Sequence, residues 1–136
     1  MTHWRAGEIW LALGSLNGLI AVALAALGSH AVALEDGQAS RLFELAYFFQ
    51  LCHALVVVAI GLVFRRLGRN RRLIGFAALG FVLGMALFSG SLYWLALAGP
   101  GSLGFWSWLT PVGGTCLLIG WTALVLASFR FNTGRS

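Results

Sequence analysis

Long apolar stretches separated by short polar breaks organise this chain. A charged residue at the centre of a membrane helix costs about 2.5 to 3.5 kcal/mol, and about 20 helical residues cross roughly 30 Å of hydrocarbon. Four stretches meet both conditions, so we predict one transmembrane helix in each. The pattern therefore predicts an all-α integral membrane four-helix bundle with up-down-up-down topology, in a single domain over residues 1–136 whose spans are about 9–28, 42–64, 73–98 and 110–129.

The last two spans are divided by a glycine-rich reversal rather than by charge. No charged residue occurs between Leu73 and Phe129, which is too long for one helix within one bilayer. Glycine can end a helix with a positive φ and proline cannot continue one, so residues 99–102, Gly-Pro-Gly-Ser, predict the reversal. Thr110 is expected to cap the fourth helix, with Pro111 in its first turn. The residues before them predict a segment at the membrane surface through Phe105, Trp106 and Trp108.

The arginines orient the predicted bundle. The chain has no lysine, and five of its nine arginines lie between the second and third spans, at positions 65, 66, 69, 71 and 72. Arg5, Arg130 and Arg135 fall on the same side, whereas Arg41 falls on the other. Basic residues favour the cytoplasmic side, so we predict that both termini are cytoplasmic. The first apolar stretch is longer than the core of a signal peptide and is expected to be retained as a helix.

The overall composition supports a membrane protein and argues against a nucleic-acid-binding one. Of the 136 residues, 60% are hydrophobic and 10% are charged, which leaves too little polar surface for a soluble globule. The pI near 10.7 reflects arginines that flank apolar spans, where anionic lipid headgroups attract them. We therefore expect the lipid bilayer as a partner and no nucleic acid.

Small residues recur at four-residue spacing within the first and third predicted spans, and glycines near the start of the fourth give it similar freedom. Such spacing lets helix backbones approach closely in lipid. The pattern favours packing within one bundle over a face reserved for dimerisation. The expected helix-packing residues are Gly14, Gly18, Gly80, Gly84, Gly113 and Gly114.

Polar residues inside the spans are the candidate functional or structural cluster. Such residues are costly in hydrocarbon and often mark a functional site. If the helices are antiparallel, most of these side chains converge in the outer half of the bundle. The candidates are Asn17, His30, Tyr47, Gln50, His53, Ser89, Ser91, Tyr93 and Thr110.

His53 is the sharpest candidate in this set. A histidine at this depth can relay a proton or bind a polar ligand. Alternatively, a neutral imidazole bonded to Gln50, Asn17 or a serine joins the helices. We favour the second interpretation, because no acidic partner shares the depth of His53.

Motifs for catalysis, metal binding and cofactors are weak in this sequence. Cys52 and His53 are adjacent, so they point about 100° apart on a helix and make a poor metal site. There is no second histidine at the depth of His53 for haem, no glycine-rich phosphate loop and no Ser/His/Asp set. We predict no catalytic, metal or cofactor-binding residues, and no cofactor.

Several short motifs occur together and in order along the chain. They are Gly28-Ser-His30-Ala, Tyr47 with Gln50-Leu-Cys-His53-Ala-Leu, Phe88-Ser-Gly-Ser-Leu-Tyr93, Thr110-Pro-Val-Gly-Gly114 and Gly120-Trp121. Together they resemble the small membrane-protein family called domain of unknown function 423, which is related to transmembrane protein 256. The resemblance implies four transmembrane helices, a bacterial inner-membrane location and no agreed molecular activity. The reversal after the third span departs from the family in being unusually rich in glycine and tryptophan.

Three functions from different classes are consistent with these features. We prefer a protein without catalytic activity that associates with itself or serves as an accessory subunit of a larger membrane complex. The first alternative is a carrier or channel for a small solute or proton, using the buried cluster of Gln50 and His53. The second is lipid or quinone binding at the outer leaflet, near His30, Ser89, Ser91 and Tyr93.

Overall fold

The structure, a computed structural model, describes residues 2–30 and 37–132, and nearly all of them are helical. Within those ranges it contains no strand, and the all-α prediction is confirmed. Four short helical turns, of 3-10 or π type, connect or interrupt the α-helices: η1 (Phe64–Arg66), η2 (Gly68–Asn70), η3 (Met85–Ser89) and η4 (Gly104–Trp108). The α-helices are α1 (Thr2–His30), α2 (Gly37–Val63), α3 (Arg71–Gly84), α4 (Gly90–Ala98) and α5 (Leu109–Asn132).

Four helical segments are long and apolar enough to cross a membrane. Each contains one of the predicted spans and extends beyond it, because polar and charged residues at a helix end can lie in the headgroup region. The chain is therefore built for four passes through a bilayer. The segments are Ala6–Gly28, Gly37–Arg66, Gly68–Ala98 and Gly104–Arg130.

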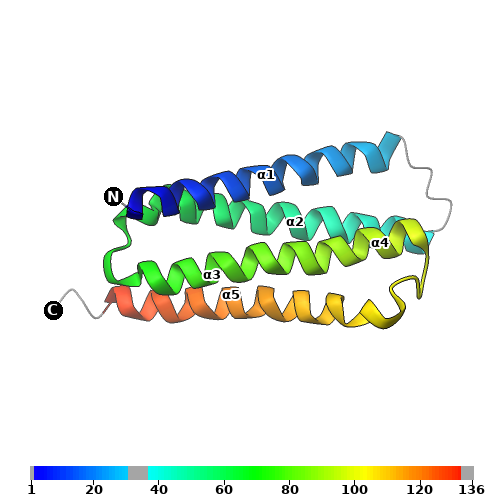
Figure 1. The fold of residues 1–136 in the computed structure, drawn as a ribbon. Coiled ribbons are helices and arrows are strands. Elements are labelled where there is room, and N and C mark those ends of the chain that lie inside the picture. Colours follow the sequence, from blue (N-terminus) through cyan, green and yellow to red (C-terminus); the bar gives the residue numbers. More distant parts are fainter. Residues whose placement is uncertain (1, 31–36, 133–136) are drawn as a thin grey trace.

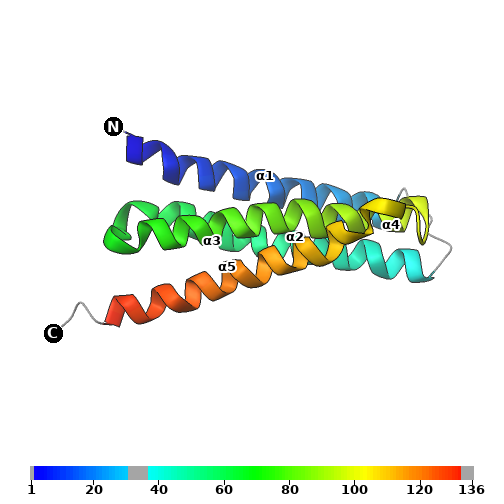
Figure 2. The same ribbon diagram turned by 60° about the horizontal axis from the view of Figure 1, so that its bottom comes forward.

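The helices lie side by side as two hairpins, and the chain reverses direction after each long segment (Figures 1 and 2). α1 packs mainly on α2, and α5 packs mainly on α3 and η3. The two hairpins meet where α2 contacts α3, η3 and α4. α1 and α5 thus lie on opposite sides of a central pair, while the start of α1 and the end of α5 share one end of the molecule (Figure 1).

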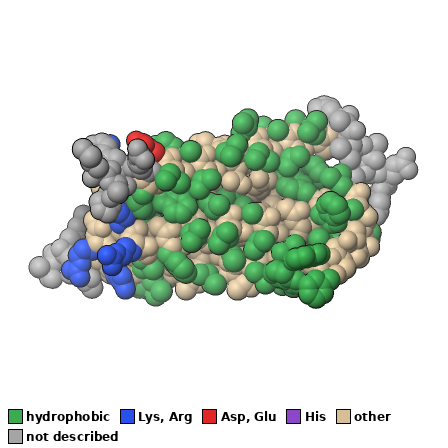
Figure 3. Space-filling model, viewed as in Figure 1, with side chains coloured by type: hydrophobic (Ala, Val, Ile, Leu, Met, Phe, Trp, Pro, Cys, Tyr) green, Lys and Arg blue, Asp and Glu red, His purple; other side chains and the backbone are tan. Residues whose placement is uncertain are grey.

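Arginine side chains gather at that same end, where the α2–α3 connector lies, beyond an apolar middle (Figures 1 and 3). One of them folds back over the connector. The Arg71 guanidinium donates to the carbonyl oxygen of Arg65 at 3.4 Å and lies 5.8 Å from the centroid of the Phe64 ring. The connector turns at Gly68, where φ is +51°. The placement of this end in the cytoplasm stays a prediction.

The third span differs from the single α-helix that we expected. A π-helical turn, η3, separates α3 from α4. A π turn accommodates one extra residue and rotates the helix beyond it, and such turns are frequent at functional sites. At this turn α5 comes very close, because a Cβ atom added to Gly113 would overlap the backbone nitrogen of Phe88. The apolar pattern carries no signal for this turn.

The reversal before α5 occurs where the sequence placed it, but α5 begins differently. Gly99 and Gly101 adopt positive φ values of +92° and +77°. The prediction that Thr110 caps the fourth helix is wrong. α5 begins at Leu109 directly after η4, and the Thr110 hydroxyl is 2.7 Å from the Ser91 hydroxyl instead. The preceding turn of η4 already continues into α5, so the side chain is free to bond to α4.

The small-residue positions lie between helices of this one chain. A Cβ atom on Gly14 of α1 would come within 2.7 Å of the Val58 backbone nitrogen of α2, and one on Gly18 within 3.9 Å of the Ala54 Cβ. Across the other hairpin, a Cβ on Gly80 would lie 3.0 Å from the Cys116 carbonyl oxygen. Gly84 and Gly113 face each other in the same interface, since a Cβ on Gly84 would lie 3.1 Å from the Gly113 carbonyl oxygen. These glycines therefore set the spacing within each hairpin.

Candidate functional site

A chain of hydrogen bonds between side chains joins three helices inside the bundle. The Tyr93 hydroxyl on α4 donates to Gln50 Oε1 on α2 at 2.9 Å. Gln50 Nε2 donates in turn to Asn17 Oδ1 on α1 at 3.2 Å. Asn17 Nδ2 closes the chain by donating to the Leu13 carbonyl oxygen at 2.9 Å. Gln50 is buried, so both ends of its amide are satisfied by protein rather than by water.

His53 is held by two hydrogen bonds that require a neutral imidazole. Its Nδ1 lies 2.7 Å from the carbonyl oxygen of Phe49, and a carbonyl only accepts, so Nδ1 carries a proton. Its Nε2 lies 3.2 Å from the indole nitrogen of Trp121, which only donates, so Nε2 offers its lone pair. The ring also stacks on Phe49, with centroids 5.9 Å apart. His53 thus connects α2 to α5.

This arrangement predicts which nitrogen of His53 is protonated. In nitrogen NMR spectra of the labelled protein in lipid nanodiscs at pH 7, we expect a protonated Nδ1 and an unprotonated Nε2 for His53. Trp121→Phe removes the indole donor and should shift the Nε2 resonance without moving the proton from Nδ1. A protonated Nε2 in the parent protein would contradict the hydrogen-bond assignment.

Serine and threonine side chains form a second, separate contact between α4 and α5. The Ser91 hydroxyl donates to the Phe88 carbonyl oxygen at 2.8 Å and lies 2.7 Å from the Thr110 hydroxyl. Thr110 then supplies the proton of the shared bond, since Ser91 has donated its own. Ser89 lies in η3 and is 1% exposed, and its hydroxyl has no hydrogen-bond partner within the described ranges.

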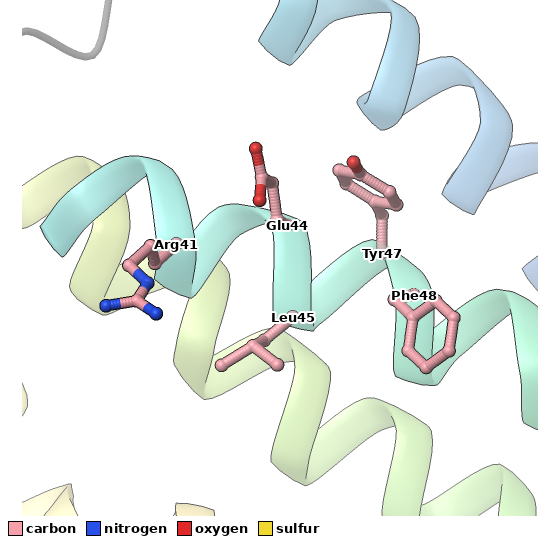
Figure 4. Close-up of a pocket in the computed structure, with 5 residues that line it drawn as sticks. All are labelled: Arg41, Glu44, Leu45, Tyr47 and Phe48. Atoms are coloured by element: carbon pink, nitrogen blue, oxygen red, sulfur yellow. The ribbon is translucent and has the colours of Figure 1, made fainter. Parts of the chain in front are cut away.

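Within the described ranges Tyr47 forms no hydrogen bond to these side chains, but its ring packs edge-on against Phe43, which packs in turn on Tyr93. Tyr47 also lines a hollow of about 430 Å³ together with Arg41, Glu44, Leu45 and Phe48 (Figure 4). Tyr47 and Glu44 point to one side of the helix, whereas Leu45 and Phe48 point to the other (Figure 4). The side chain of His30 lies outside the part that the structure describes. Gln50 thus bonds to Tyr93 of α4 and not to Tyr47 of its own helix.

The expected convergence on a single polar site is thus corrected to three separate contacts. Asn17, Gln50 and Tyr93 form one, Ser91 and Thr110 form another, and His53 forms the third. The expected partners of His53 were also wrong, since Gln50 and Asn17 bond to each other. Trp121, which sequence reasoning did not select, is the true partner. Its only signal was its place in the Gly120-Trp121 motif.

A groove of about 600 Å³ opens between α2 and α5 beside the His53–Trp121 bond. Its walls carry Phe49 and Cys52 from α2 and Thr115 from α5. Cys52 and Cys116 are both free thiols. Nowhere in the described ranges do three His, Cys, Asp or Glu residues come close enough to hold a metal ion.

Comparison with known proteins places the chain in a family. A family described as "Protein of unknown function (DUF423)" matches residues 24–114. The chain belongs to this family. A "UPF0382 membrane protein" of Staphylococcus epidermidis is 35% identical, over 91% of this chain and 98% of the relative. A "UPF0382 membrane protein" of Haemophilus influenzae is 34% identical, over 89% of this chain and 94% of the relative.

A further relative indicates in which membrane proteins of this family lie. The "UPF0382 inner membrane protein YgdD" of Escherichia coli K12 is 31% identical, over 90% of each chain. No solved structure matches this chain. The family and the four long apolar helices together make it a small multi-pass protein of the inner membrane.

Proposed function

We propose that this protein is a structural subunit of a membrane assembly, formed either by copies of itself or as an accessory subunit of a larger complex, and that it has no catalytic activity of its own. The observation that carries the proposal is the internal pairing of its membrane-embedded polar side chains. Asn17, Gln50 and Tyr93 bond across α1, α2 and α4. His53 and Trp121 bond across α2 and α5. These bonds hold the helices in one arrangement.

The same pairing argues against a carrier or channel that uses Gln50 and His53. A transport path needs polar groups that exchange partners with a solute or with water. Here the Gln50 amide accepts from Tyr93 and donates to Asn17, so both ends of this buried amide are bonded to other helices. A solute would have to break bonds that join helices. A fixed scaffold fits these contacts better.

The surface of the bundle also suits a subunit of an assembly. Of the four spanning segments α1 is the least buried, since it packs mainly on α2. Its apolar side chains such as Leu19, which is 67% exposed, are left to lipid or to a neighbouring subunit. The small-residue positions are already used inside the hairpins, so they do not define the contact with a neighbour.

The proposal predicts a discrete mass above that of one chain. Two differently tagged copies would be co-expressed at native level, extracted as native nanodiscs and weighed by native mass spectrometry. If the chain self-associates, purification through one tag is expected to recover copies that carry the other tag. If it is an accessory subunit, a discrete mass that includes a different protein is expected. Dilution with excess lipid should not dissociate either form. A single chain with bound lipid as the only species would overturn the proposal.

A further inference from the structure

The groove between α2 and α5 exists because these two helices do not pack along their length. α5 packs on α3 and η3 instead, and the His53–Trp121 bond crosses the gap that is left. The volume of about 600 Å³ lies within the usual range of small-molecule pockets, about 300 to 1,000 Å³. The groove is therefore large enough for a ligand and is anchored at a polar pair.

The position of the groove along the helices restricts what can enter it. Pro111, in the first turn of α5, lines one end, and Trp121 lies about 15 Å further along that helix at 1.5 Å per residue. The groove thus runs from near the arginine-poor end to the middle of the span. Trp121 and Leu118 are 46% and 69% exposed, so the groove is open on the lipid-facing side of the bundle. A ligand must reach this groove through hydrocarbon, so it must be lipid-soluble.

The shape of the walls favours a ring over a flexible chain. Phe49 and Phe88 have ring centroids 5.0 Å apart, and the Trp121 indole stands on the α5 side. Aromatic faces and edges of this kind pack well against another planar ring. The groove beside these rings stays open because two of its lining residues are small: Gly114 has no side chain and Cys52 has a short one.

The polar pair at the groove supplies one donor and one acceptor side by side. Trp121 Nε1–H donates to His53 Nε2 across 3.2 Å, which is the long end of the range for such bonds. Because both partners line the open groove, a ligand there can exchange this bond for bonds of its own. An oxygen substituent fits both partners, because a carbonyl accepts from the indole and a hydroxyl donates to the imidazole.

We propose that this groove binds a lipid-soluble ring of the quinone class. The carbonyl of the oxidised ring accepts from Trp121 Nε1–H, and the hydroxyl of the reduced ring donates to His53 Nε2. A saturated acyl chain would fill the same space but use neither group. The proposal concerns binding alone and does not depend on the structural role proposed above, since a monomer could also carry the groove.

The test uses the full chain in nanodiscs with a photoreactive azido-benzoquinone, and mass spectrometry to map the labelled peptides. We expect label in residues 49–53 and 114–121, displaced by decylubiquinone and not by palmitate. Gly114→Leu should fill the groove and reduce specific labelling about tenfold, the loss expected from blocking a site of modest affinity. A Cβ at Gly114 meets only the Phe88 ring, at 3.7 Å, so the variant can fold.

Two further variants keep the outcome decisive. Gly90→Leu adds the same side chain on α4, where an added Cβ meets nothing within 4 Å, and should label as the parent does. Trp121→Phe keeps a ring but removes the donor. It should weaken decylubiquinone binding about 5- to 10-fold and leave the failure of palmitate to displace the label unchanged. The proposal is overturned if palmitate displaces the label as well as decylubiquinone does, or if Trp121→Phe binds unchanged. Equal labelling of the two folded leucine variants would overturn it too.

Discussion

Gly113→Ala is expected to lower the free energy of unfolding by about 2 to 3 kcal/mol, the cost of forcing an extra methyl group into a tightly packed contact. The added Cβ would overlap the Phe88 backbone nitrogen and lie 2.9 Å from the Leu87 carbonyl carbon. Backbone atoms cannot rotate away as a side chain can. α5 must therefore move off the π turn, which also strains the contact of Gly113 with Gly84.

The adjacent residue provides the control for this prediction. Gly114→Ala places the same methyl group one position along α5, where it meets the edge of the Phe88 ring at 3.7 Å, an ordinary contact. Because alanine favours helix by about 1 kcal/mol over glycine, this variant should be as stable as the parent or slightly more so. Reversible unfolding in bicelles measures both variants. Equal stabilities would contradict the close approach of α5 to Phe88.

Gln50→Leu is expected to destabilise the bundle by about 2 kcal/mol, because it leaves a half-buried donor and a half-buried acceptor without partners. The Tyr93 hydroxyl loses its acceptor and Asn17 Oδ1 loses its donor in the same substitution. Neither group has water nearby in hydrocarbon to replace the lost bond. Hydrogen bonds in membrane proteins average near 0.6 kcal/mol, so most of the effect comes from the unpaired groups.

A double-mutant cycle separates that cost from simple loss of volume. Tyr93→Phe alone should cost about 1 kcal/mol, but in the Gln50→Leu background it should cost much less, since the hydroxyl is already unpaired. Thr122→Val serves as control, because the exposed Thr122 hydroxyl bonds only to the Leu118 carbonyl oxygen of its own helix. Additive effects of Gln50→Leu and Tyr93→Phe would show that the two side chains are not coupled.

The sequence predicted the polar residues of the bundle better than their pairing. Gln50 and His53 were selected because polar groups in hydrocarbon need partners, and both have them. We expected His53 to bond to Gln50, Asn17 or a serine. The side chains of Gln50 and His53 diverge instead, because Gln50 faces Asn17 and Tyr93 whereas His53 faces Trp121 on α5.

Two features, Trp121 and the π turn, explain why the hydrogen-bond partners of His53 and Gln50 could not be predicted from the sequence. Tryptophan near the middle of an apolar span gives the same signal as any large side chain, so nothing distinguished it as a hydrogen-bond donor. The extra residue of the π turn rotates α4 relative to α3 by about 100°, the angle of one helical residue. That rotation contributes to the placement of Tyr93 against Gln50, and it leaves no trace in the hydrophobic pattern.

By itself the sequence determined that the chain has four apolar spans, a glycine-rich reversal after Ala98, and an arginine cluster between the second and third spans. These features arise from hydrophobicity, charge and the backbone preferences of glycine and proline, which act locally. The tertiary structure decided which helices touch, because backbone contacts at Gly14, Gly80 and Gly113 set the spacing within the hairpins. That packing holds α5 on α3, and so it leaves the groove beside α2 that the His53–Trp121 bond crosses.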